Sequence, residues 1–467
     1  MGTESILHTL RKQARESRLL DQARDLAERY IAGVRSMRVI PDAQAVRGLE
    51  SLPTALPQEP TDPSRILEML HRYGSPATTA QTGGRYFGFV NGGSLPAAIA
   101  ARWLADAWDQ NAAMYVMSPV SSALEARCEK WLVSLLGLPP ETAMGLVGGT
   151  SIATLCGLAA GRDELLRRAG WDCGARGLLG APEIRVVLGA QAHASVSKAL
   201  GLLGLGRDRV ERVPVDGQGR IVPAHLPRMD GRTLLILQAG NVSTGAFDPF
   251  AAIVPAAREA GAWIHVDGAF GLWAAASPRF ARLMEGAALA DSWSADAHKT
   301  LNAPYDNGIV FCRHREALAA AMRVTGAYLS FSEDRDGMMY TPDMSRRARG
   351  IDLWATLLSL GRSGAAELVE GLCGLADLFA RLMAREGFVI QNEVVFNQVL
   401  VTCATPELTT RTLTHMQASG ECWCGGTTWN NDPAIRISVC SYATTEEDVE
   451  RSVRAFVAAR EKAGRTE

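Results

Sequence analysis

The sequence lacks the features of membrane, secreted and nucleic-acid-binding proteins. It has no stretch of about 18 uninterrupted apolar residues, and its N-terminal segment holds no apolar core before a small-residue cleavage site. It also has no long run of like charge, and 48 Lys and Arg stand against 50 Asp and Glu, for a formal net charge of -2. We therefore expect a cytoplasmic protein without a membrane or nucleic-acid partner.

Cysteines occur without the spacing of a disulfide framework. The nine of them are scattered from Cys128 to Cys440, which is typical of reduced thiols in a cytosolic protein. Cys422 and Cys424 form one close pair, but no second cysteine pair or histidine pair stands at ligand spacing. We therefore expect no metal site.

The chain does contain enough apolar sequence for a large core, because 47% of its 467 residues are hydrophobic. Residues 18–75 predict two amphipathic helices around a Pro-rich connection. This pattern has too few apolar positions for an independent core. Between residues 94 and 330, helical stretches alternate with short apolar runs at 184–189, 233–239, 262–267, 291–295 and 307–312. This alternation predicts an α/β fold with a mostly parallel sheet covered on both faces.

The region after Gly350 predicts a different arrangement. A long helical stretch reaches about residue 385, and three apolar strands and two helices follow it. We expect a helical arm over 1–85, a large α/β domain over 86–350 and a small C-terminal α+β domain over 351–467.

Ligands of open α/β sheets bind beyond the carboxyl ends of the strands, so polar residues after the apolar runs are candidate site residues. Thr150 and Ser151 follow a glycine turn and open a helical run, and a helix N-terminus there could bind a phosphate. The glycines could equally form an ordinary turn, with Thr150 or Ser151 as its N-cap.

Asp267 ends an apolar strand, where an unpaired carboxylate would be costly and needs a cationic partner. A protonated pyridine nitrogen is one such partner, because the carboxylate keeps the ring charged and able to draw in electrons. A structural aspartate that caps the next helix explains this residue, taken alone, equally well.

Lys299 stands 32 residues beyond Asp267, at the end of the next expected strand. A lysine amine in a confined site can form an imine with an aldehyde cofactor, and the adjacent His298 can reach a phosphate. His193 opens another helix after a strand, where an imidazole can lie flat on a cofactor ring, although a lone histidine is more often a packing residue.

These residues lie in motifs that occur in one order along residues 85–455: RYFGFVNGG, SPVSSALE, GGTSIATL, QAHASVSKA, GAFDPF, HVDGAFG, ADSWSADAHKTLNAPYDNG, RRARGIDLW and RISVCSYATTEEDV. Together they resemble the pyridoxal phosphate-dependent group II amino acid decarboxylases. The resemblance implies fold-type I, the aspartate aminotransferase-like fold, and decarboxylation of an L-amino acid to an amine and CO2.

The resemblance also implies roles for individual residues. Lys299 would form the Schiff base with pyridoxal 5'-phosphate, Asp267 would pair with the pyridine nitrogen and His193 would stack on the ring. The implied phosphate contacts are Thr150, Ser151 and His298.

Other positions match the family less directly. Asp248 and Ala269 match positions near the cofactor, while Asn241 stands where many members carry a threonine, which leaves its contact open. Arg436 matches an arginine that orients substrate, but it could also be a structural ion-pair partner.

Tyr328, 29 residues past Lys299, matches a tyrosine that family members carry on a loop. The resemblance implies that this tyrosine protonates the carbanion after CO2 has left. The segment after it is polar, as a lid would be, although an ordinary surface loop has the same composition. The residues that the resemblance assigns to the substrate pocket are Tyr86, Phe87, Phe89, Gln110, Asn111, Ala113 and Tyr115. They leave aromatic and small acidic substrates both open.

Two further expectations concern assembly and reaction. The resemblance implies a homodimer in which the arm wraps the partner and the active sites are shared. The alternatives left open are an aldehyde synthase, aminotransferase or aldolase on the same fold, and a catalytically silent binding or scaffold subunit.

Overall fold

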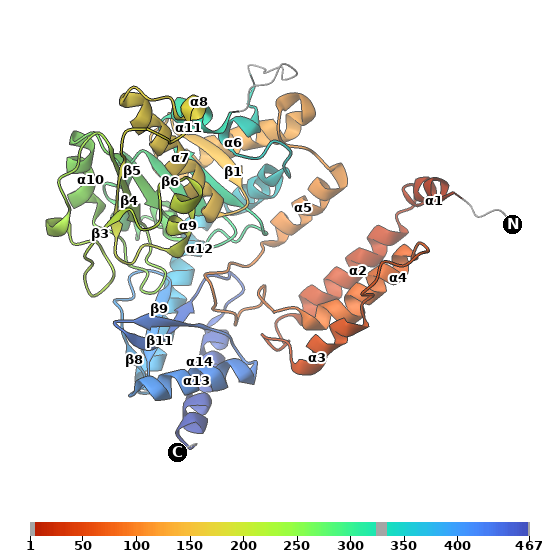
Figure 1. Cartoon of the computed structure of the whole chain (residues 1–467). Coiled ribbons are helices and arrows are strands. Elements are labelled where there is room, and N and C mark those ends of the chain that lie inside the picture. The colour runs from red at the N-terminus through yellow and green to blue at the C-terminus, as the bar shows by residue number, and fades with distance from the viewer. Residues whose placement is uncertain (1–4, 324–333, 466–467) are drawn as a thin grey trace.

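The computed structural model describes residues 5–323 and 334–465. The arm stands to one side of a large α/β body, and the small domain lies below that body in the view shown (Figure 1). The expected α/β class, with a mostly parallel central sheet and a small C-terminal domain, is confirmed.

The large sheet has seven strands in the order β1-β7-β6-β5-β4-β2-β3. Their bounds are β1 Ala143–Val147, β2 Arg185–Gly189, β3 Val210–Val213, β4 Thr233–Gln238, β5 Trp263–Asp267, β6 Ser292–Asp296 and β7 Gly308–Cys312. Strands β3, β2, β4, β5 and β6 run parallel, and β7 runs antiparallel between β6 and β1. The carboxyl ends of the parallel strands therefore share one edge.

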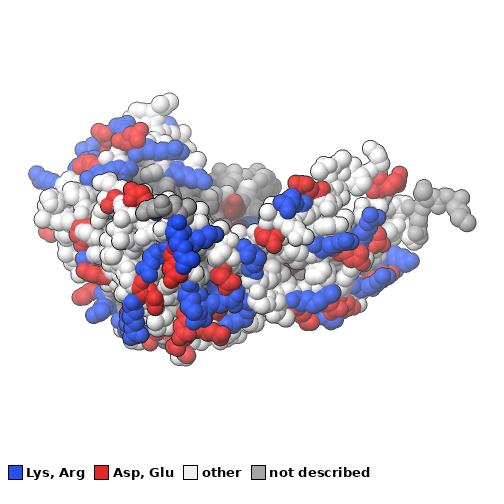
Figure 2. Space-filling view, turned by 90° about the horizontal axis from the view of Figure 1, so that it is seen from below, with Lys and Arg blue, Asp and Glu red and all other residues white. Residues whose placement is uncertain are grey.

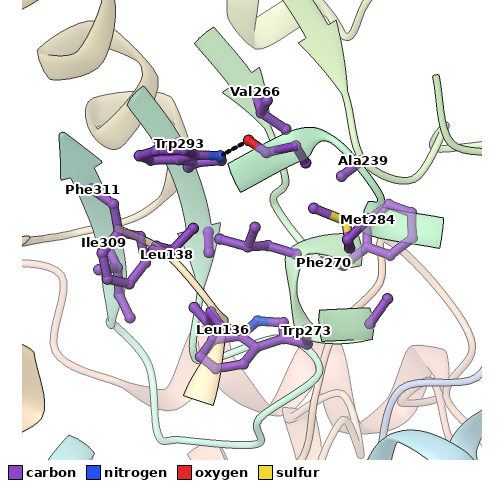
Figure 3. Packing of buried hydrophobic residues seen from close by; sticks show 14 of the residues in the cluster. Leu136, Leu138, Ala239, Val266, Phe270, Trp273, Met284, Trp293, Ile309 and Phe311 are labelled. Atoms are coloured by element: carbon purple, nitrogen blue, oxygen red, sulfur yellow. Dashed lines mark hydrogen bonds between the residues drawn. The ribbon is translucent and has the colours of Figure 1, made fainter. Parts of the chain in front are cut away.

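Both faces of this sheet are buried, which explains why its strands are continuous apolar runs. Successive side chains point to opposite faces, so Ile264 and Val266 join one core cluster while Trp263 joins another. Figure 3 shows the first cluster, in which Nε1 of Trp293 donates a 2.9 Å hydrogen bond to the carbonyl of Ala287. That bond satisfies the polar atom of a fully buried indole.

Helices cover the two faces separately. The helices of the body and its borders are α5 Pro96–Trp108, α6 Pro119–Leu135, α7 Thr150–Arg168, α8 Cys173–Arg176, α9 Ala194–Leu202, α10 Phe250–Glu259, α11 Arg315–Met322 and α12 Arg349–Arg385. Residues of α7, α9 and α11 pack on one face, and residues of α6, α10 and α12 pack on the other. Helix α12 is kinked at Gly361, where φ is 61°.

The small domain is built on an antiparallel sheet in the order β10-β11-β9-β8. Its elements are β8 Val389–Ile390, β9 Gln398–Thr402, α13 Pro406–Ser419, β10 Gly425–Trp429, β11 Asp432–Ser438 and α14 Glu446–Gly464. Helices α13 and α14 pack with the second half of α12 around a separate apolar core. A capping box between Thr445 and Asp448 begins α14.

The arm consists of α1 Ile6–Gln13, α2 Arg18–Gly33, α3 Ala43–Gly48 and α4 Pro63–Met69. Asp42 and Asp62 cap α3 and α4 by accepting backbone N–H groups. These helices bury none of their residues, and Leu20, Ile31 and Leu70 are more than half exposed. The arm therefore keeps apolar surface that it cannot cover by itself.

Charges of both signs are interspersed over the face seen from below (Figure 2). In the described ranges, no helix is long and apolar enough to cross a membrane. Those ranges also hold no group of three metal-ligating side chains.

Candidate active site

Asp267, Lys299 and His193 come together at the carboxyl edge of the large sheet. Asp267 ends β5, and Lys299 lies three residues past the end of the neighbouring β6. His193 follows β2 as the N-cap of α9. Charges on His193 and Lys299 both act on the pKa of Asp267, as expected for groups that share one site.

Asp267 is a buried carboxylate without a described cationic partner in direct contact. It is 6% exposed, and its Oδ1 accepts the backbone N–H of Ala269 at 3.3 Å. Burial raises the pKa of Asp267 above its usual range, although the nearby His193 and Lys299 oppose the shift. A bound cation at this carboxylate would relieve the cost of burying it.

The imidazole of His193 has a defined orientation. Its Nδ1 accepts the backbone N–H of Ser195 at 3.2 Å and lies 2.8 Å from the Ser195 hydroxyl. An acceptor at Nδ1 puts the proton of the neutral ring on Nε2. Desolvation lowers the pKa of His193, and the positive charges of Lys299 and Arg436 lower it further, so the neutral ring is favoured.

Lys299 forms a short ion pair with Asp296, the last residue of β6. Its Nζ lies 2.9 Å from Oδ2 of Asp296, and the two side chains are 19% and 4% exposed. Sequence reasoning did not single out Asp296, although an aspartate three residues before a strand-end lysine was a readable signal. The structure adds it to the site.

The expected phosphate end lies beside this pair. Thr150 begins α7, and its backbone N–H donates to Asp296 at 2.7 Å. Its hydroxyl is buried and has no hydrogen-bond partner in the residues that the structure describes. Ser151 follows with its surface exposed. His298 accepts the Asn307 backbone N–H on Nδ1 at 3.0 Å, which leaves the proton of the neutral ring on Nε2.

Hydrogen bonds within its own loop hold Asn241, whereas Asp248 is held by backbone groups of two other segments. Oδ1 of Asn241 accepts the N–H groups of Ser243 and Thr244 at 2.9 and 3.2 Å. The Asp248 carboxylate accepts the N–H groups of Ile221 and Gln238 at 2.8 and 2.7 Å, and burial raises its pKa to about 7. Gln238 lies opposite Asp267 in the sheet, so Asp248 holds the end of β4, the strand next to Asp267, in place.

Ala269 lies between the two site carboxylates. Its N–H donates to Asp267, and its carbonyl accepts the N–H of Asp296 at 2.8 Å. This residue therefore fixes the spacing of β5 and β6 where the site residues leave the sheet.

The aromatic residues near position 87 do not all face one way. Phe87 is fully buried and packs edge-on against Phe379 in the small-domain core, because alternate residues of an extended segment point in opposite directions. Tyr86 instead stacks on Trp423, with ring centroids 5.2 Å apart and planes 6° apart. Phe89 stacks on the same indole and is 60% exposed.

Arg436 lies on β11 and contributes positive charge to the surroundings of His193. Its Nε is buried without a hydrogen-bond partner among the described residues, and burial lowers its pKa. A partly buried guanidinium of this kind can bind an anion.

Residues 110–115 are hydrogen-bonded to residues 336–346, which follow the point where the described chain resumes at residue 334. Gln110 donates to the carbonyl of Trp108, and Asn111 accepts the N–H groups of Ala113 and Arg346. The Tyr115 N–H donates to Asp336 at 2.8 Å. In the described ranges, none of these bonds joins the segment to Lys299. Tyr328, the expected proton donor, lies outside the described residues.

The residues present fit pyridoxal phosphate. Within the described part of the chain, they supply a lysine amine, a buried carboxylate that lacks a cation in contact, and a buried Thr150 hydroxyl without a partner at the N-terminus of α7. These are the groups that the aldehyde, the ring nitrogen and the phosphate of this cofactor require.

The family model of the pyridoxal-dependent decarboxylase conserved domain matches residues 47–403. The chain belongs to this family. Tryptophan decarboxylase 1 of Oryza sativa subsp. japonica is 26% identical to this decarboxylase over 390 residues, which are 78% of this chain and 75% of that protein. Cysteine sulfinic acid decarboxylase of Mus musculus is 28% identical over 339 residues, 69% of this chain and 68% of that protein.

The decarboxylase also resembles a crystal structure of Oryza sativa TDC with PLP and tryptamine. The TM-score is 0.89 at 23% sequence identity, and the match covers 98% of this chain and 99% of that chain. The protein therefore has the fold of these enzymes and is a pyridoxal phosphate-dependent amino acid decarboxylase. When bound, the cofactor supplies an aldehyde for an amine and a ring that takes up the electron pair left by the broken Cα–carboxylate bond.

Proposed function

We propose that Lys299 holds the cofactor through its amine, that Asp267 keeps the ring nitrogen protonated and that His193 lies on the face of the ring. The observation that carries this assignment is the buried Asp267 carboxylate, which lies near Lys299 and His193 but has no cation in contact among the described residues. Thr150, Ser151 and His298 are proposed to hold the phosphate, which suits the position of Thr150 and Ser151 at the N-terminus of α7 and the buried Thr150 hydroxyl, which has no hydrogen-bond partner among the described residues.

Arg436 is proposed to bind the carboxylate of the amino acid. Support comes from its buried Nε, which has no hydrogen-bond partner in the described ranges, and from the effect of its charge on the pKa of His193. Binding there would hold the substrate on the side of the ring that carries His193. The Nε2–H of His193 could then donate to the same carboxylate until CO2 leaves.

The decarboxylase is proposed to be a homodimer with shared active sites. A groove of about 820 Å³ between the arm and α5 is lined by Leu26, Ile31, Leu70, Trp103 and Tyr442, among others. Trp103, Leu104 and Trp108 on α5 are also about half exposed. A second copy seated against this surface would bury it and could bring residues 110–115 to the partner's cofactor.

Tyr328 is proposed, on the sequence resemblance alone, to protonate Cα after CO2 has left. Removal of its hydroxyl should then lower amine formation by about two to four orders of magnitude. If sites are shared and the loop crosses to the partner, mixing Tyr328→Phe chains with Lys299→Ala chains should restore amine formation. No restoration would count against a loop that acts across the dimer.

The cytoplasm is proposed as the place of action. All nine cysteines are unpaired, and each is buried, which suits a reducing compartment.

The direct test of function is a screen of the twenty common amino acids and close analogues for CO2, amine, aldehyde, ammonia and peroxide. We expect equal amounts of CO2 and amine from at least one of them. Aldehyde with ammonia and peroxide would identify an aldehyde synthase instead. No turnover, with no visible imine band after incubation with the cofactor, would identify a silent homologue.

A further inference from the structure

The side chain of Asp296 connects three parts of the active site. Its Oδ2 lies 2.9 Å from Nζ of Lys299 and 3.5 Å from Nε2 of His298. Its Oδ1 accepts the backbone N–H of Thr150 at 2.7 Å. Because this side chain is only 4% exposed, water cannot readily replace these partners.

We propose that Asp296 is a positioning residue that holds Lys299 as an ammonium whenever the lysine is not joined to the cofactor. This inference rests on the role proposed above for Lys299. If a substrate amine displaced Lys299 from the cofactor aldehyde, Nζ would be released and would take up the proton that the substrate ammonium had lost. The exchange needs no net proton from water, and Asp296 stabilises the resulting ammonium next to the reacting centre.

The backbone and one carboxylate oxygen of Asp296 are fixed independently of Lys299. Its N–H donates to Ala269 at 2.8 Å, and its carbonyl accepts Nε1 of Trp273 at 3.0 Å. Thr150 then fixes Oδ1, which leaves Oδ2 directed at Nζ. A residue that only satisfied the first N–H of α7 would need Oδ1 alone, so the placement of Oδ2 indicates a second role.

Charge and distance in this cluster favour the pairing of Lys299 with Asp296. Burial opposes ionisation of Asp296, but the nearby Lys299 and His298 and the bond from Thr150 hold its pKa below the usual value, so it is a carboxylate. Burial lowers the pKa of His298, which leaves this imidazole neutral near pH 7. Of the two basic side chains beside this carboxylate, Lys299 is the closer, with Nζ 2.9 Å from Oδ2 against 3.5 Å for Nε2 of His298.

Asp291 offers a matched comparison at the opposite end of the same strand. It is 8% exposed, and its carboxylate accepts the backbone N–H of Ile264 at 2.8 Å. Its ion-pair partner is His314, at 2.8 Å, and not a lysine. Loss of the Asp291 charge should therefore leave Lys299 unaffected.

The experiment measures how fast Nζ of Lys299 is acetylated in the full chain after the cofactor has been removed. Acetic anhydride reacts with an amine and not with an ammonium, and peptide mass spectrometry compares Lys299 with the exposed Lys198 in the same sample. The proteins compared are wild type, Asp296→Asn, Asp296→Ala and Asp291→Asn. The asparagine at 296 keeps an acceptor for Thr150 but loses the charge, whereas alanine loses both.

We expect Asp296→Asn and Asp296→Ala to raise acetylation of Lys299 relative to Lys198 by about tenfold or more, as expected when a close opposite charge is removed. Asp291→Asn should match wild type. Wild-type acetylation in Asp296→Asn, or a rise in Asp296→Ala alone, would overturn the proposal, because loosening of α7 would then explain the effect. Borohydride trapping of the cofactor on Lys299 of the wild-type protein tests the lysine's role separately, so the two failures can be told apart.

Discussion

The indole of Trp423 lies directly against the backbone of Gly88, so a Cβ at this position would overlap the ring. Tyr86 and Phe89 stack on that same indole, each with a centroid distance of 5.2 Å. The glycine therefore allows three aromatic rings to gather where the large body meets the small domain.

Gly88→Ala should displace the indole and lower the free energy of unfolding by about 1–3 kcal/mol, the usual cost of overpacking. Urea unfolding, followed by tryptophan fluorescence, measures this loss. Trp423→Leu removes the ring that the new methyl group would meet. The double variant should therefore lose less free energy of unfolding than the two single variants lose together. Additive losses would show that the two residues do not clash.

The strand-end rule located Lys299 and Asp267 from the sequence, because it depends only on where an apolar run stops. The same rule covers Asp296, which ends β6, but it did not show the role of this residue, because that role depends on Thr150, 146 residues earlier in the chain. It also could not show that Phe87 points into the small-domain core while Tyr86 stacks on Trp423. Those outcomes depend on packing between segments that are distant in sequence.

The sequence predicted the parallel or antiparallel direction of the strands only in part. Strand β7 is fully buried like its parallel neighbours, so its apolar run does not reveal that it runs antiparallel. The edge strand β3 is largely exposed and has no apolar run to predict it. The sequence also did not show that residues 110–115, which were expected at the substrate pocket, are hydrogen-bonded to Asp336 and Arg346.

Asp267→Asn should weaken cofactor binding about tenfold to 100-fold, the usual worth of a hydrogen bond to a charged group, and should bring turnover close to background. The amide has nearly the same shape but cannot keep the ring nitrogen protonated. Fluorescence titration with pyridoxal phosphate and an amine assay measure the two effects. Asp291→Asn is the control, since it removes another buried carboxylate at the far edge of the sheet. Cofactor affinity equal to wild type in Asp267→Asn would mean that this aspartate is structural.

His265 should make the protein less stable as the pH falls. The ring is fully buried, lies 2.8 Å from the Ser292 hydroxyl, and burial lowers its pKa to about 3. Below about pH 6.5, the unfolded chain binds a proton that the folded chain does not, so its contribution to the free energy of unfolding falls by up to about 1.4 kcal/mol per pH unit. Above that pH both states are neutral at this residue, and it adds no pH dependence.

Urea unfolding between pH 7.5 and 5 tests this prediction in wild type, His265→Asn and His225→Asn. The first variant should lose part of the pH dependence even if it is less stable throughout. The second should keep all of it, because His225 lies on the surface. An unchanged slope in His265→Asn would assign the acid sensitivity to other groups.

The most direct test of the central claim is to reduce the holoenzyme with borohydride and to identify the modified peptide by mass spectrometry. The account predicts that the pyridoxyl group is on Nζ of Lys299, which lies at the edge of the sheet beside Asp267, and that Lys299→Ala shows neither the adduct nor turnover. A pyridoxyl adduct on another lysine, or turnover by Lys299→Ala at the wild-type rate, would contradict it.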